Sequence, residues 1–209
     1  METLTRWVQG KWFFDSASRL FRGFVRLFYG LHIHGLENIP ERGGAIVASN
    51  HISAFDPPVI GVSVPREVNF MAKRELFASR LSNLVFRGLR AFPVDRQKSD
   101  MRAIKEALRR LEQGVIIGIF TEGTRNRSDG RVFDGASFLA QRAQVPIVPT
   151  AIWREGRSFH VRFDAPIMPQ GKTREEASQL TERVMARVQG MMPPLSRPES
   201  GGSHSRRPV

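Results

Sequence analysis

The chain has 209 residues, of which 41% are hydrophobic and 25% are charged, so one folded domain with a real core is expected and general disorder is excluded. It contains no cysteine, which excludes disulfides, thiolate metal sites and a cysteine nucleophile. The formal net charge of +12 predicts an anionic partner, which could be a nucleic acid, an anionic membrane surface or a phosphorylated substrate.

Residues 1–29 are predicted to form a separate N-terminal segment. Eight of the 19 aromatic residues lie here, and apolar residues recur at helical spacing, whereas Arg19, Arg22 and Arg26 fall on another face. A basic face opposite an aromatic face suits an amphipathic helix that lies in the headgroup region of a membrane. Packing of the same helix on the protein's own core is the alternative. The apolar runs are too short to span a bilayer, and arginines interrupt the region where a signal peptide needs an uncharged core.

From residue 30 onward, apolar runs of strand length alternate with amphipathic helical segments. Strands are predicted at 31–35, 45–48, 68–71, 91–94, 115–120, 145–152 and 159–163, and helices at 58–64, 76–89, 99–113, 133–143 and 174–188. The alternating pattern of the last of these strands is typical of an edge strand. The order predicts an α/β domain over residues 30–189, with a mixed, largely parallel sheet flanked by helices. Residues 190–209 are rich in Pro, Gly, Ser and Arg and are predicted to be a disordered tail.

His51 and Asp56 are the first residues that indicate chemistry. They are five residues apart, so they can touch only across a turn, and Pro57 disfavours a helical conformation at Asp56. A carboxylate beside an imidazole orients the ring and leaves its other nitrogen free to accept a proton. A solvent-facing histidine followed by a helix-capping aspartate is the alternative. The pair follows an apolar strand, however, and open α/β sheets bind substrates at the carboxyl ends of their strands.

Two arginines occupy comparable positions. Arg96 and Arg125 each follow a predicted strand, so we expect both cations at the edge of the sheet that carries His51. Either arginine alone could be an ordinary surface charge. The remaining histidines are not spaced as a metal cluster, and His32 and His34 alternate on a predicted strand, which favours a structural role.

Four segments together resemble the glycerolipid acyltransferase family typified by 1-acyl-sn-glycerol-3-phosphate acyltransferase. They are Asn-His-Ile-Ser-Ala-Phe-Asp at 50–56, Phe-Pro-Val-Asp-Arg at 92–96, Phe-Thr-Glu-Gly-Thr-Arg at 120–125 and Val-Pro-Ile-Val-Pro at 145–149. The resemblance covers roughly residues 30–165 and rests on the order and spacing of all four segments. The chain departs from the family pattern at Arg90, Thr121 and Asp134, which leaves the acceptor and donor preference more open than the type of reaction.

The resemblance implies a role for particular residues. His51 is expected to act as general base and Asp56 to orient it. The residues expected to bind the glycerol-phosphate part of the acceptor are Lys73, Arg96, Glu122, Gly123, Thr124 and Arg125. No metal and no cofactor is expected.

The reaction that the resemblance implies is direct acyl transfer from acyl-CoA or acyl-carrier protein to the sn-2 hydroxyl of 1-acyl-sn-glycerol-3-phosphate, which gives phosphatidic acid. The expected partners are a lysophospholipid and a membrane surface, not a nucleic acid, and the expected location is peripheral or monotopic on the cytoplasmic face of the cell membrane. Glycerol-3-phosphate or another lysolipid is the alternative acceptor. A non-catalytic module that binds membranes or nucleic acid would also explain the net charge, but not the setting of His51 and Asp56.

Overall fold

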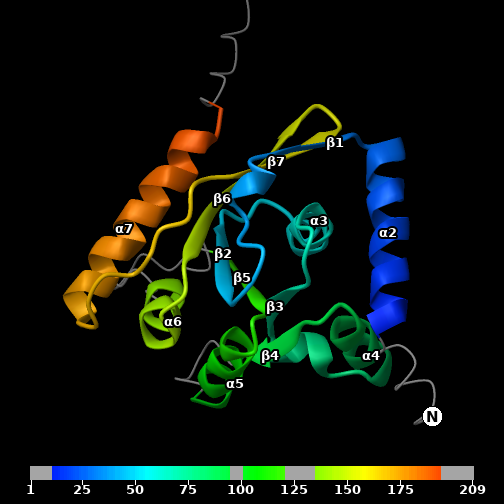
Figure 1. The fold of residues 1–209 in the computed structure, drawn as a ribbon. Coiled ribbons are helices and arrows are strands. Elements are labelled where there is room, and N and C mark those ends of the chain that lie inside the picture. Colours follow the sequence, from blue (N-terminus) through cyan, green and yellow to red (C-terminus); the bar gives the residue numbers. More distant parts are fainter. Residues whose placement is uncertain (1–10, 95–100, 121–134, 194–209) are drawn as a thin grey trace, which may run out of the picture.

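The computed structural model describes residues 11–94, 101–120 and 135–193, which form a sheet with helices on both faces (Figure 1). Within these residues the strand order is β1-β7-β6-β2-β5-β3-β4. The strands are β1 (Leu31–His34), β2 (Ala45–Ser49), β3 (Val68–Lys73), β4 (Phe92–Val94), β5 (Ile116–Phe120), β6 (Ile147–Glu155) and β7 (Ser158–Phe163).

The sheet is mixed and largely parallel, which confirms the predicted fold class. Among the strands of the described residues, five neighbouring pairs run parallel, and only β6 and β7 are antiparallel. The prediction that residues 159–163 form an edge strand is wrong, because β1 pairs with β7 on its outer side. The alternating pattern of β7 has another cause: Phe159, Val161 and Phe163 face the core, while His160 and Arg162 point to the opposite face.

Each face of the sheet carries its own hydrophobic core. Helices α2 (Lys11–Phe28) and α3 (Asp56–Ser63) contribute to one core, and α5 (Met101–Glu112), α6 (Gly135–Ala143) and α7 (Arg174–Met191) contribute to the other. In β2, Ala45 and Val47 point into the first core, and Ile46 and Ala48 into the second. The central strands are therefore buried on both sides, which explains why they read as continuous apolar runs.

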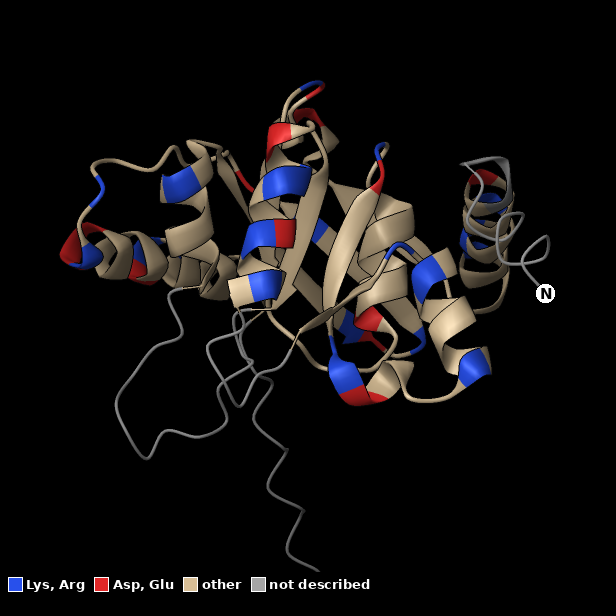
Figure 2. Ribbon diagram, turned by 90° about the horizontal axis from the view of Figure 1, so that it is seen from below, with Lys and Arg blue, Asp and Glu red and all other residues tan. Residues whose placement is uncertain are grey.

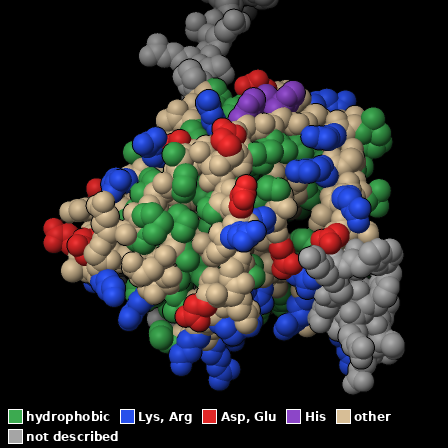
Figure 3. Space-filling view, in the orientation of Figure 1, with side chains coloured by type: hydrophobic (Ala, Val, Ile, Leu, Met, Phe, Trp, Pro, Cys, Tyr) green, Lys and Arg blue, Asp and Glu red, His purple; other side chains and the backbone are tan. Residues whose placement is uncertain are grey.

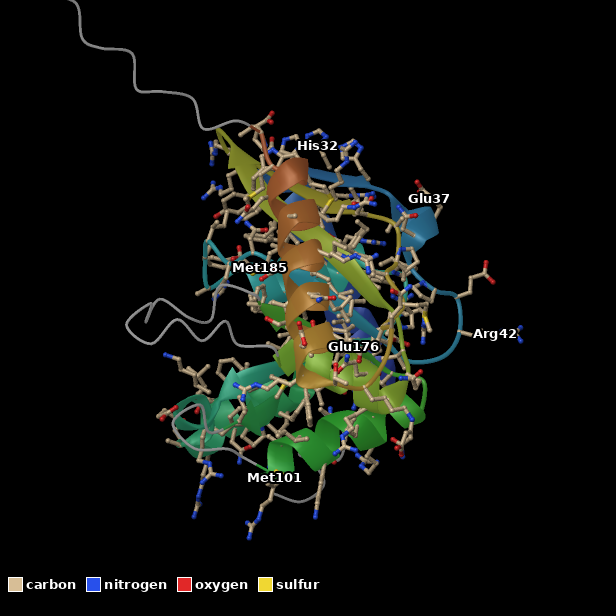
Figure 4. All side chains as sticks on the ribbon, turned by 90° about the vertical axis from the view of Figure 1, so that its left-hand side faces the viewer. His32, Glu37, Arg42, Met101, Glu176 and Met185 are labelled. Carbon is tan, nitrogen blue, oxygen red and sulfur yellow. The ribbon has the colours of Figure 1, made fainter. Side chains whose placement is uncertain are left out.

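Helix α7 crosses one face of the sheet in Figure 4, where Glu176 marks its first turn. Thr173 and Glu176 form a capping box at this end, in which each side chain accepts a hydrogen bond from the backbone of the other residue. The helix continues to Met191, beyond the predicted end at residue 188.

The segment predicted as one helix at 76–89 is divided into two. A 3₁₀ turn, η2 (Arg74–Phe77), precedes helix α4 (Arg80–Gly88). Ser79 between them has an extended backbone, and its hydroxyl accepts a hydrogen bond from the amide of Ser82. This serine is the N-cap of α4, so the local capping preference outweighs the continuous apolar spacing.

Helix α2 has apolar side chains on two of its faces. Val25 is buried and Phe21 is half-buried against the core beside the sheet, so the helix packs on the protein as the alternative interpretation required. Leu20 and Leu27, each 78% exposed, lie with Phe24 and Phe28 on the outer side. In the described part of the chain, no helix combines the length and the apolar character that crossing a bilayer requires.

Candidate active site

The site begins where β2 ends, at the buried side chain of Asn50. Its amide nitrogen donates to the carbonyl oxygen of Ile152 at 2.7 Å, and its amide oxygen accepts from the backbone N–H of Ile152 at 2.8 Å. The side chain thereby extends the β2–β6 pairing past Ser49, the last paired residue of β2. The backbone can then leave the sheet after Asn50 while the end of β2 stays attached to β6. The sequence did not predict a role for Asn50, because its partner lies 102 residues away.

The next turn is organised by the carboxylate of Asp56, which is fully buried at the first residue of α3. One oxygen, Oδ2, accepts hydrogen bonds from His51 Nδ1 at 2.7 Å, the Ile52 amide at 2.6 Å and the Ser53 amide at 2.7 Å. The predicted contact between His51 and Asp56 across a turn is therefore present. Because the carboxylate accepts from Nδ1, the proton of the neutral ring lies on Nδ1 and Nε2 keeps its lone pair. The His51 side chain is 39% exposed, so this nitrogen is within reach of a ligand.

Aromatic rings hold the imidazole from one side. Phe120, the last residue of β5, stacks on His51 with 4.3 Å between ring centroids, and Phe70 stacks on Phe120 at 5.7 Å. Space for Phe70 exists because residue 118 is glycine: a Cβ there would lie 2.2 Å from the phenylalanine ring. The sequence assigned no role to Phe120, although its place at the end of a buried strand next to the third motif was a usable signal.

Lys73 is the only predicted binding residue that the structure describes. It is exposed at the carboxyl end of β3, and β2, β5 and β3 are parallel neighbours, so it lies at the same edge of the sheet as His51. Arg96 and the segment Glu122, Gly123, Thr124 and Arg125 lie outside the described residues. The strands that precede them in the chain, β4 and β5, end at this edge.

The other described histidines form a separate group on the outer strands. His32 of β1 stacks on His160 of β7 at 4.6 Å between ring centroids, and His160 stacks on Trp153 of β6 at 5.2 Å. Figure 3 shows histidine side chains together at the top of the molecule. Burial lowers the pKa of His160, so its neutral form is favoured. No group of three or more His, Cys, Asp or Glu side chains among the described residues is arranged to hold a metal.

The Asn50 pairing gives a prediction about stability. Asn50→Ala leaves the N–H and C=O of Ile152 without partners in a buried place, at a cost of about 1–3 kcal/mol for each group. We expect a loss of about 2–6 kcal/mol in the free energy of unfolding, measured by urea denaturation. We also expect the variant to lose the single Nδ1–H tautomer of His51, observed by NMR of ¹⁵N-labelled histidine.

Asn38→Ala is the matched control. Asn38 donates from its side chain to the carbonyl of Phe163 at 3.0 Å in a half-buried place, so its loss lowers stability without touching the His51 turn. An Asn50→Ala protein that retains the wild-type histidine spectrum would show that Asn50 does not position His51.

The chain is similar to known proteins. The family model for Acyltransferase matches residues 30–153, a segment that contains β1 to β5, most of β6 and the His51 turn. A 1-acyl-sn-glycerol-3-phosphate acyltransferase of Bacillus subtilis is 35% identical over 123 residues, which cover 58% of this chain and 62% of the relative. A human 1-acyl-sn-glycerol-3-phosphate acyltransferase alpha is 29% identical over 187 residues, which cover 79% of this chain and 65% of the relative.

A solved structure has the same fold. The crystal structure of the 1-acyl-sn-glycerophosphate acyltransferase PlsC from Thermotoga maritima superimposes with a TM-score of 0.67 at 29% identity, over 86% of this chain and 78% of that one. The chain spans less than two thirds of the Bacillus subtilis relative and of the human one. Since the family model covers more than half of the chain, the chain belongs to the Acyltransferase family.

Proposed function

We propose that this chain transfers a fatty acyl group from an acyl thioester to the free sn-2 hydroxyl of 1-acyl-sn-glycerol-3-phosphate, giving phosphatidic acid. The observation that carries the proposal is the 2.7 Å contact between His51 and the buried Asp56 at the carboxyl edge of a parallel sheet. Membership of the Acyltransferase family and the names of the relatives support the reaction and the acceptor. The donor is the thioester of coenzyme A or of acyl-carrier protein.

In the proposed mechanism, His51 Nε2 accepts the proton of the acceptor hydroxyl as that oxygen attacks the thioester carbonyl. The tetrahedral intermediate collapses with cleavage of the C–S bond, and the sulfur leaves as a thiolate. Thiols have a pKa of about 8.5, so this leaving group needs little acid assistance. The proton on the imidazolium then passes to the thiolate or to water, and no acyl-enzyme is formed.

Asp56 has two tasks in this mechanism. Its carboxylate holds His51 in the Nδ1–H tautomer before the reaction and stabilises the imidazolium that forms during it. Burial strengthens this stabilisation, because the charges interact in a medium less polarisable than water. Phe120 keeps the ring plane in place, so the free nitrogen stays directed at the acceptor site.

The acceptor phosphate is assigned to cations at the same edge. Lys73 is placed there by β3, and Arg96 with Glu122, Gly123, Thr124 and Arg125 are proposed to complete the glycerol-phosphate site. Arginine can bind a phosphate through two parallel hydrogen bonds, and lysine acts as a point charge.

The enzyme is further proposed to work as a peripheral or monotopic protein on the cytoplasmic face of the cell membrane. The outer face of α2 supports this location: Leu20, Phe24, Leu27 and Phe28 are exposed there, and arginines flank them. Hydrophobic side chains protrude at the right-hand edge of the molecule in Figure 3, where α2 lies. Such a surface suits a helix lying in the headgroup region.

The first test of the reaction is the release of free thiol from acyl-CoA, with and without lysophosphatidic acid. His51→Ala should lower the acceptor-dependent rate by about 10²- to 10⁴-fold, the usual contribution of a general base. His160→Ala, which changes a histidine of the separate group, should leave the rate unchanged. Wild-type turnover in His51→Ala would contradict the assigned role.

The same assay with other substrates identifies the acyl donor and the acceptor. Activity only with acyl-carrier protein, with glycerol-3-phosphate or with another lysolipid would change the assigned substrates and leave the type of reaction intact. No transfer to any of them, together with salt-sensitive binding to lipid or nucleic acid, would identify a binding module instead.

Removal of the lysine charge tests the phosphate site. Lys73→Gln should lower kcat/KM for lysophosphatidic acid by about tenfold, the loss expected for one charge-assisted hydrogen bond. Transfer to a monoacylglycerol, which has no phosphate, should not change. Lys172→Gln, at another exposed lysine, is the control, and an equal loss with both acceptors would remove Lys73 from the phosphate site.

Membrane attachment through α2 can be tested without deleting the helix, since deletion would also remove the buried Val25. The double substitution Leu20→Ser with Phe24→Ser should weaken sedimentation with phosphatidylglycerol vesicles by about tenfold, because two inserted apolar side chains are lost. Leu36→Ser, at an exposed leucine on another surface, should have no effect. Unchanged binding of the double variant would show that this face of α2 stays in water.

A further inference from the structure

Helix α4 has an apolar stripe that the fold does not use. Leu81 and Val85 of the helix and Leu89, its C-cap, are 73%, 47% and 45% exposed and follow one another at a spacing of four residues, so they lie along one side. The inner side of α4 is already packed, since Phe86 contacts Phe77 of η2 with 5.6 Å between ring centroids. The exposed stripe therefore contributes little to folding.

The charged residues of this helix are all positive. The helix contains Arg80 and Arg87 and no acidic residue. In Figure 2, it carries the blue of basic residues and none of the red of acidic residues. The guanidinium of Arg87 donates to the neutral amide of Asn83 at 2.7 Å, a contact that leaves its charge available to an anion. An apolar stripe flanked by arginine is the composition of a surface that binds anionic lipid.

The position of α4 relates the stripe to the two features already described. The start of α2 lies next to α4 in Figure 1, and Arg90, two residues after α4, stacks on Phe14 of α2 at 5.3 Å. At its other end, α4 is joined through η2 to Lys73 at the carboxyl edge of β3. The helix therefore lies between the proposed membrane helix and the proposed phosphate site.

We propose that α4 is a second lipid-contacting element, whose Leu81, Val85 and Leu89 enter the headgroup region of an anionic bilayer while Arg80 and Arg87 bind lipid phosphates. This inference rests on the membrane location in the proposed function and extends it to a second surface. At about 13 Å, a helix of this length can lie in the interface but cannot span it. Contact through α4 would hold the edge that carries Lys73 at the level where the phosphate of a lysolipid lies.

A second copy of this chain is the other candidate for covering the stripe. Charge argues against it, because pairing two α4 helices would bring Arg80 and Arg87 of both copies together without an acidic residue on either helix. A bilayer with anionic headgroups offers the opposite charge together with apolar depth.

The absence of cysteine from the chain allows a site-specific test. Leu81→Cys, labelled with the environment-sensitive dye NBD in the full-length protein, reports whether this position leaves water. We expect a blue shift of the emission on addition of phosphatidylglycerol vesicles and a much smaller one with phosphatidylcholine vesicles. Met168→Cys, at a residue 54% exposed outside α2 and α4, is the matched control and should show no shift.

The second measurement is vesicle binding by unlabelled variants. Leu81→Ser with Val85→Ser should weaken binding to phosphatidylglycerol vesicles by about tenfold. Arg80→Gln with Arg87→Gln should also weaken this binding, and the difference from the wild type should disappear at high salt, which screens the charges. Met168→Ser should bind as the wild type does.

Three results would overturn the proposal. The first is vesicle binding without a spectral shift at position 81. The second is a shift that occurs without vesicles, together with dimer formation detected by light scattering. The third is failure of the wild type to bind anionic vesicles. These measurements do not depend on catalysis. A protein that lacks the proposed acyltransferase activity but shows the shift would retain the membrane surface and lose the enzymatic assignment.

Discussion

The geometry of the site depends on the buried carboxylate of Asp56. A charge removed from water is stable only when hydrogen bonds replace its hydration, and here three donors converge on one oxygen: the His51 ring and the amides of Ile52 and Ser53. The same residue begins α3, whose N-terminus favours a negative charge. The turn, the helix start and the ring orientation are therefore coupled, and none can change without leaving the carboxylate poorly paired.

Two further contacts make the turn rigid from its other sides. Asn50 holds the end of β2 to β6 through a pair of hydrogen bonds, and Phe120 covers one face of the imidazole. Both come from central strands that are buried on each side, so the positions of these groups are set by a packed core. A reactive group on a loop gains precision when rigid elements support it in this way, and the small residue Gly118 is part of that support.

On the outer surface, apolar side chains are exposed on two helices. Helices α2 and α4 each pack an inner face on the protein and present further leucine, valine or phenylalanine side chains outside, next to arginines. Exposed apolar stripes are unfavourable in water, so their presence on two neighbouring helices supports the proposal that this surface contacts a membrane. Helix α4 is joined through η2 to Lys73 at the carboxyl edge of the sheet, and Phe14 of α2 contacts Arg90 just after α4. Lipid binding by this surface, as proposed, would bring an acceptor to the site without its leaving the bilayer surface.

The sequence by itself determined the α/β class and most strands and helices, because these depend on local periodicity. It also predicted the contact of His51 with Asp56, because a spacing of five residues allows that contact only across a turn. Asp56 is the first residue of α3, so the restriction expected from Pro57 does not keep it out of the helix. Arg96 and residues 122–125 stay predictions. Only the tertiary structure decided that β1 covers β7, that Asn50 pairs with Ile152 and that Phe120 stacks on His51. It also decided that α2 is apolar on two faces and that Ser79 starts a new helix. The serine cap is local, but the other features depend on contacts between residues that are distant in the chain. A local pattern does not specify which partner a strand, side chain or helix face will meet.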